Sequence, residues 1–187
     1  MGQTLWLFRH GETEWSLSGQ HTGRTDLPLT ENGRRQASAL ADLVAGTKFD
    51  LVLVSPMSRA RETSRLAGFA DAQTDANLLE WDYGDYEGRK TAEIRNGRPG
   101  WSLWSDGVPN GETVEQVGAR AEAVIARAVN AGGNVALFGH GHILRVLTAR
   151  WLGLPPADGR LFALETGTVS KLGYERDTRV LTAWNLR

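Results

Sequence analysis

Two segments of the sequence place a histidine directly after an apolar run. The first, LWLFRHGETEW, has Arg9 and His10 at its centre, and the second, FGHGHILR, contains His140. A third apolar run leads into SPMSRARET, which carries Arg59. Guanidinium groups match the geometry of phosphate oxygens and stay charged at every working pH. If these segments meet in the folded chain, they form an anion pocket.

The residue types in these segments predict phosphoryl transfer. Histidine can attack phosphorus and can also carry a proton near neutral pH. One neutral histidine can attack in line while the arginines and a second, protonated histidine neutralise the phosphoryl oxygens. The departing alcohol needs a proton donor, and the segment LLEWDYGDYEG offers four carboxylates for this role: Glu80, Asp82, Asp85 and Glu87.

Alternating strands and helices are predicted to position these residues. Continuous apolar runs predict strands at 4–8, 49–56 and 134–139, and helical patterns follow at 31–45, 57–68, 114–131 and 142–153. Thr30 is predicted to cap one helix, and Thr113 with Gln116 forms a capping box for another. Further short strands are predicted at 161–164, 168–175 and 179–185, the last two as a pair.

This pattern is typical of an α/β fold whose mainly parallel sheet is covered on both faces. In such folds ligands bind beyond the carboxyl ends of the strands. His10, Arg59 and His140 each follow a predicted strand, so we expect them at one rim of the sheet.

Composition sets limits on the partners. The 187 residues suit one domain spanning 1–187, with 21 basic and 22 acidic residues and a net charge of −1. This balance gives no support for nucleic acid or a membrane surface as partner. The chain has no cysteine, so a cysteine nucleophile and thiolate metal sites are excluded. With no stretch long enough to span a membrane and no signal-peptide pattern, a cytoplasmic protein is expected.

Four motifs together resemble the histidine phosphatase superfamily, which includes the cofactor-dependent phosphoglycerate mutases and many phosphatases. They are LFRHGETEW, SPMSRARET, LLEWDYGDYEG and FGHGHILR, in the expected order over nearly the whole chain. The resemblance implies a three-layer α/β/α fold with a mainly parallel central sheet. It also implies a small phosphorylated substrate and no cofactor.

The resemblance also implies roles for individual residues. His10 would be the nucleophile that is transiently phosphorylated, and Glu80 would protonate the leaving oxygen and then deprotonate water. The phosphoryl group would be bound by Arg9, by Arg59 and by His140 as a cation. Further substrate contacts are expected from Ser16, Thr22, Gly23 and the backbone of Gly141.

A finer resemblance links the chain to the sedoheptulose-bisphosphatase branch and to related bacterial acid phosphatases. It is carried by TEWSLSGQHTGRTDLPLT, EWDYGDYEG, NGET, GHGHILR and ETGTVSKLGYE. It implies a sugar phosphate or bisphosphate as substrate. His142 is expected on the leaving-group side of the pocket. Charge for a distal phosphate is assigned to Arg24, Arg95 and Arg98, and stacking on the carbon chain to Trp101 or Trp104.

Two other functions stay open beside the phosphatase. A phosphoglycerate mutase must keep water from its phosphohistidine. This chain is shorter than the mutases and carries Ser16 where they usually have asparagine, which favours hydrolysis. A phospho-ligand binding module with a dead site is the second alternative.

Several residues have plainer interpretations. A zinc site at His140 and His142 is disfavoured because Arg9 and Arg59 would repel a cation. His21 is expected to be a loop residue, and Arg145 is expected to extend along its helix rather than bind substrate. An exposed strand near the C-terminus leaves a homodimer possible.

Overall fold

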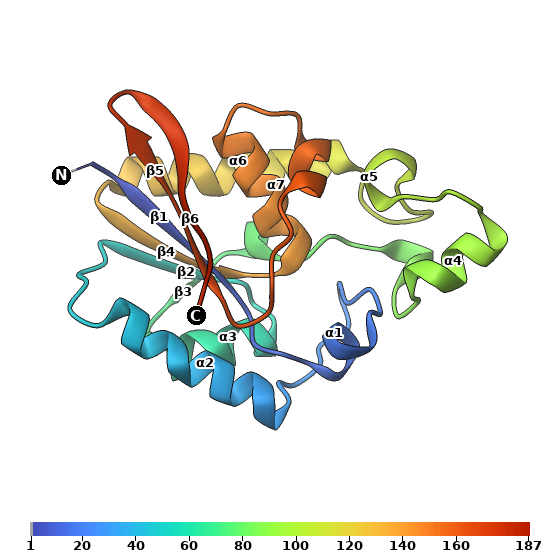
Figure 1. The fold of residues 1–187 in the computed structure, drawn as a ribbon, viewed down its shortest axis with the longest axis horizontal. Coiled ribbons are helices and arrows are strands. Elements are labelled where there is room, and N and C mark those ends of the chain that lie inside the picture. Colours follow the sequence, from blue (N-terminus) through green and yellow to red (C-terminus); the bar gives the residue numbers. More distant parts are fainter. Residues whose placement is uncertain (1) are drawn as a thin grey trace.

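A computed structural model describes residues 2–187, which form one six-stranded sheet with helices on both sides (Figure 1). The strand order is β3-β2-β4-β1-β5-β6. The strands are β1 (Thr4–Arg9), β2 (Leu51–Val54), β3 (Gln73–Thr74), β4 (Asn134–Gly139), β5 (Val169–Glu175) and β6 (Thr178–Leu186). β1, β4, β2 and β3 pair in parallel, whereas β5 lies antiparallel to both β1 and β6. The predicted α/β class with a mainly parallel sheet is confirmed.

Alternate residues of the central strands enter two separate hydrophobic clusters. Leu5 and Leu7 of β1 face the helices α6 (Val114–Ala131) and α7 (Gly141–Trp151). Trp6 and Phe8 face the helices α2 (Glu31–Val44) and α3 (Ser58–Leu66) on the other side. Both faces of the strand are therefore buried, which explains its continuous apolar run and gives the three layers visible in Figure 1.

Helix boundaries follow the predicted caps. The Thr30 hydroxyl accepts from the backbone N–H of Gly33 at the start of α2, and Thr113 and Gln116 form the predicted capping box at the start of α6. Gly132 ends α6 with a φ of 69°.

The structure also differs from the sequence prediction. The segment after β1, predicted as loop, contains the five-residue helix α1 (Glu14–Ser18), which begins with a capping box at Thr13. Two more short helices, α4 (Thr91–Gly97) and α5 (Leu103–Asp106), lie at the same end of the molecule as α1 (Figure 1). The strand predicted at 161–164 is wrong, because a 3₁₀ helix runs over Pro156–Leu161 and residues 162–164 are not in a strand. Side chains bond the carbonyls of Ala163 and Leu164 instead of a neighbouring strand.

The predicted pair of strands at the C-terminal end is confirmed as the β5–β6 hairpin. Within residues 2–187, no helix is both long enough and apolar enough to cross a bilayer.

Candidate active site

A cavity of about 180 Å³ opens where β1 and β4 end side by side. Arg9 pairs in register with Gly139, and the backbone N–H of His10 donates to the Gly139 carbonyl at 3.1 Å. The two strands thus deliver His10 and His140 to the same rim, with ring centroids 5.1 Å apart. A larger hollow of about 410 Å³ lies against α3, and no histidine lines it.

His10 lines the cavity as a neutral imidazole. Its Nδ1 lies 2.7 Å from the Gly11 carbonyl, which can only accept, so Nδ1 carries the proton and Nε2 keeps its lone pair. Burial, followed by the charges of Arg59 and Arg9, lowers the pKa of His10 to about 3. At neutral pH the ring is therefore uncharged, with its one proton on Nδ1, and it is nucleophilic at Nε2.

The backbone after His10 is held by a close glycine contact. A Cβ on Gly11 would lie 2.2 Å from the Gly33 carbonyl oxygen, and a Cβ on Gly33 would lie 2.1 Å from the Glu12 carbonyl oxygen. Gly33 weakens the start of α2 by intrinsic propensity, but it lets the helix approach the loop that carries the nucleophile.

Arg9 supplies a buried positive charge beside His10. One terminal N–H donates to the Leu164 carbonyl. Its Nε is buried and has no hydrogen-bond partner within residues 2–187. Burial lowers the pKa of Arg9, and Glu80 is the main opposing influence. A buried donor without a partner, on an arginine that lines the cavity, is suited to an anionic ligand.

Without a bound phosphoryl group His140 is also neutral, and the cationic state that the resemblance implies for the substrate complex stays a prediction. Arg59 donates from Nε to Nδ1 of His140 at 3.2 Å, and because arginine can only donate, this nitrogen must be unprotonated. Nε2 then holds the proton and donates to the Ser55 hydroxyl at 2.7 Å. Burial and the charge of Arg59 hold the pKa of His140 well below its usual value.

Arg59 and His140 lie behind the cavity, and neither is among the residues that line it. The Arg59 side chain is fully buried and donates to the carbonyls of Thr22, Gly23 and Thr25. Arg59 therefore connects the loop before α2 to His140, and its positive charge contributes to the low pKa of His10.

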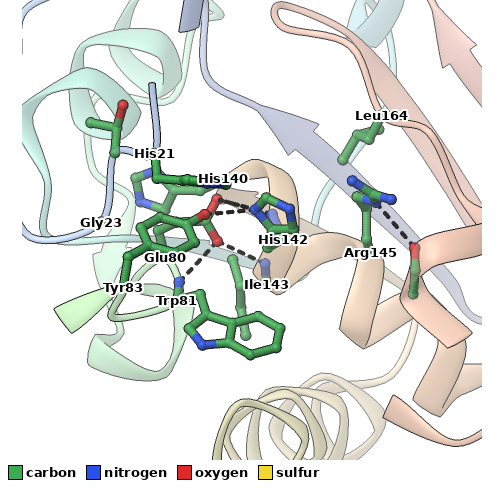
Figure 2. A network of polar contacts seen from close by, with 12 residues as sticks. His21, Gly23, Glu80, Trp81, Tyr83, His140, His142, Ile143, Arg145 and Leu164 are labelled. Carbon is green, nitrogen blue, oxygen red and sulfur yellow. Dashed lines mark hydrogen bonds and ion pairs between the residues drawn. The ribbon is translucent and has the colours of Figure 1, made fainter. Parts of the chain in front are cut away.

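Glu80 lines the cavity as a carboxylate held by three backbone N–H groups (Figure 2). Its Oε1 accepts from Trp81 and Ile143 at 3.0 and 2.9 Å, and its Oε2 accepts from His142 at 2.9 Å. Burial acts to raise the pKa of Glu80, but its hydrogen bonds, those with His142 first, outweigh burial and hold the pKa well below the usual value. Without substrate, Glu80 is therefore a carboxylate; its role as proton donor to the leaving oxygen stays a prediction.

Tyr83 and His142 form the wall next to Glu80. The Tyr83 hydroxyl lies 2.6 Å from Nδ1 of His142, and the His21 ring packs 4.8 Å from the Tyr83 ring. Burial lowers the pKa of His142 and lowers that of His21 to about 4. Three uncharged aromatic groups therefore face the space that a leaving group would occupy.

The remaining predicted contacts divide into two groups. Ser16, Thr22, Gly141 and His142 line the cavity. Gly23 does not: its N–H donates to the Glu87 carboxylate, and a Cβ there would lie 2.5 Å from the Trp81 carbonyl oxygen, so this glycine serves loop packing.

The distal groups assigned from the sequence lie elsewhere. Arg24, Arg95 and Arg98 do not line the cavity; they contact Asp82, the Trp101 carbonyl and Asp106, respectively. Trp101 is buried at 2% exposure and cannot stack on a substrate, and Trp104 lies outside the cavity lining.

Sequence reasoning missed several lining residues: Trp15, Gly19, Gln20, His21, Tyr83 and Arg145. Trp15 stood within the first motif and Tyr83 within the acidic one, so adjacency to the motifs was an available signal. In the described part of the chain, no three His, Asp or Glu side chains lie together as a metal site would require.

Comparison with known proteins agrees with this geometry. A model of the histidine phosphatase superfamily (branch 1) matches residues 5–187. An acid phosphatase of Mycobacterium tuberculosis is 40% identical over 186 residues, which cover 97% of this chain and 92% of the relative. A sedoheptulose 1,7-bisphosphatase of Saccharomyces cerevisiae is 39% identical over 181 residues, covering 79% of this chain and 67% of the relative.

A solved structure of an open reading frame product from Mycobacterium tuberculosis matches with a TM-score of 0.93 at 40% identity. The match covers 98% of this chain and 97% of that one. With a family match that extends from the first strand to the last residue, the chain belongs to the histidine phosphatase superfamily, branch 1.

Proposed function

We propose that the protein hydrolyses small phosphomonoesters through a phosphohistidine on His10, with sugar phosphates as the substrate class. The observation that carries the proposal is the fixed tautomer of His10. Its proton is held at Nδ1 by the Gly11 carbonyl, so the lone pair on Nε2 is available in a cavity shared with Arg9. Phosphomonoester hydrolysis is also the activity that the family and its phosphatase relatives support.

In the first step, Nε2 of His10 attacks phosphorus and the bond to the ester oxygen breaks. Arg9 stabilises the phosphoryl oxygens through its guanidinium charge, and the nearby charge of Arg59 adds to the positive potential. The leaving oxygen takes a proton from Glu80. A bound phosphate raises the pKa of this carboxyl, since like charges disfavour ionisation, so Glu80 can hold that proton once substrate is present.

In the second step, water attacks the phosphohistidine. Glu80 accepts the proton of the water, the P–N bond breaks, and inorganic phosphate leaves with His10 again neutral. The low pKa of Glu80 in the free protein means that the carboxylate is regenerated when phosphate departs.

The sugar phosphate class rests on the cavity and on one relative. Its lining supplies hydroxyl, amide and imidazole groups suited to a polyol: Ser16, Gln20, His21, Thr22, Tyr83 and His142. The yeast relative is named for a sugar bisphosphate. A cytoplasmic location, a homodimer and the absence of a nucleic-acid partner stay predictions from the sequence.

The test measures phosphate release from sugar phosphates, phosphoglycerates and nucleotides in the presence of EDTA, for the wild type and for His10→Ala. We expect release that EDTA does not inhibit, and a loss of at least about a thousandfold in the variant, in which the nucleophile is missing. Retained hydrolysis in His10→Ala would contradict the proposal. Phosphoryl transfer between positions of phosphoglycerate, without free phosphate, would indicate a mutase.

A further inference from the structure

Arg145 is the second arginine in the cavity lining, and the mechanism above does not use it. It lies on α7 one helical turn after Gly141 and three residues after His142, and all three line the same cavity. Residues spaced by three and four share one helix face. Arg145 therefore extends the basic lining from the end of β1, where Arg9 lies, along α7.

The Arg145 side chain is held in one conformation by three contacts. Its Nε donates to the Gly159 carbonyl at 3.1 Å, and one terminal nitrogen, Nη2, donates to the Arg160 carbonyl at 3.2 Å. The guanidinium stacks over Trp104, 4.7 Å from the ring centroid. A guanidinium fixed in this way loses little conformational entropy when it binds a further group.

Arg145 forms no ion pair with a carboxylate within residues 2–187; burial lowers its pKa, and the charge of Glu80 in the same cavity is the main opposing influence. Arg24, Arg98 and Arg150 each form an ion pair with a carboxylate, whereas Arg145 contacts only carbonyls and an aromatic ring. Its second terminal nitrogen, Nη1, donates to no group in this part of the chain. A half-buried arginine with a free N–H group and no carboxylate partner favours an anionic ligand.

We propose that Arg145 binds a second anionic group of the substrate while His10 reacts with the first. The second group is a phosphate or a carboxylate at the other end of a short carbon chain that crosses the cavity past His142. The inference deepens the proposed function and rests on it. It gives the distal role to Arg145 in place of Arg24, Arg95 and Arg98, which lie outside the cavity lining.

Binding measured without turnover tests this assignment separately from catalysis. In the His10→Ala background, isothermal titration gives Kd for two pairs of ligands that differ by one anionic group. The pairs are fructose 1,6-bisphosphate with fructose 6-phosphate, and 3-phosphoglycerate with glycerol 3-phosphate. We expect the His10→Ala protein to prefer the doubly anionic member of at least one pair. Adding Arg145→Gln is expected to reduce that preference by about 10- to 100-fold, the usual effect of losing a charge-assisted hydrogen bond.

Two further variants control for charge and folding. Arg98→Gln removes the same charge from an exposed arginine outside the cavity and is expected to leave the preference unchanged. Arg145→Lys keeps the charge but lacks the planar guanidinium. Its preference for the doubly anionic ligand is expected to lie between that of the His10→Ala protein and that of the Arg145→Gln variant. If Arg145→Gln does not fold, a lysine variant with the full preference would overturn the assignment.

Other results of these experiments would overturn either the role of Arg145 or the proposed function. No preference for a doubly anionic ligand in either pair, or a preference that Arg145→Gln leaves intact, would overturn the role of Arg145. Hydrolysis that persists in His10→Ala would overturn the proposed function alone, because the Kd ratios report on Arg145 whether or not His10 is the nucleophile.

Discussion

Replacing His10 with asparagine is expected to change how the stability of the protein depends on pH. Asparagine does not titrate, and its amide still offers an N–H to the Gly11 carbonyl. In the wild type, the pKa of His10 is about 3 in the folded state, against 6.5 in an unfolded chain. As the pH falls below 6.5, the unfolded chain binds a proton that the native state does not bind. Wild-type stability is therefore lost progressively until the pH reaches the folded-state pKa.

The size of the effect follows from the pKa difference. One pH unit within this window corresponds to 1.36 kcal/mol, so lowering the pH from 6.5 to 4 removes about 3 kcal/mol through His10 alone. Small domains are stable by about 5–15 kcal/mol, so this loss is easily measured. The other histidines are present in both proteins, and their contributions cancel when the two pH profiles are subtracted.

Urea unfolding of both proteins at pH 7 and pH 4 measures how much unfolding free energy each one loses. The comparison requires the same m-value, the slope of unfolding free energy against urea concentration, for both proteins. Between these pH values, the wild type is expected to lose about 3 kcal/mol more unfolding free energy than His10→Asn. If the wild type is unfolded at pH 4, a comparison at pH 5 should still show about 2 kcal/mol. Parallel profiles would refute the reasoning, because they would mean that native His10 titrates near pH 6.5 and is partly protonated where the enzyme works.

Three further substitutions have defined expectations. Glu80→Gln cannot exchange protons with the leaving group or with water, so kcat should fall by about 10²- to 10⁴-fold in steady-state kinetics. Its amide NH2 group also cannot accept from all three backbone N–H groups that Glu80 binds, so a melting curve should show a lower thermal midpoint. Gly33→Ala should lower the unfolding free energy by about 1–3 kcal/mol in urea titrations, although alanine favours helices, because its Cβ would lie 2.1 Å from the Glu12 carbonyl oxygen. Thr113→Ala should cost about 1 kcal/mol in the same assay through loss of the α6 capping box, with kcat unchanged.

The sheet and the rim of the site were predictable because their signals are local. Each strand that carries a site residue is a short apolar run with a motif at its end, so the sequence indicated both the element and its functional edge. Two helix starts were marked by threonine caps. Helix α1, by contrast, has five residues, too few for a periodic pattern.

The protonation states were not predictable because they depend on contacts between distant segments. His140 is neutral because Arg59 donates to one ring nitrogen and Ser55 accepts from the other, and these residues lie 81 and 85 positions away. The distal arginines were misassigned for the same reason. Arg145 was expected to extend along its helix, whereas in the folded chain it contacts the Gly159 carbonyl and the Trp104 ring.

The in-register pairing of β1 with β4 has a consequence for the order in which the protein acquires its properties. His10 and His140 lie far apart in the sequence, and the hydrogen bond from the His10 N–H to the Gly139 carbonyl joins the two segments that carry them. During synthesis, β1 emerges early but has no β4 beside it until most of the chain has left the ribosome. The low pKa of His10 depends on its burial and on the charges of Arg59 and Arg9, so a nascent chain still lacking β4 has an ordinary histidine at this position. Reactivity towards phosphate esters is therefore expected only after β4 has joined β1 in the sheet.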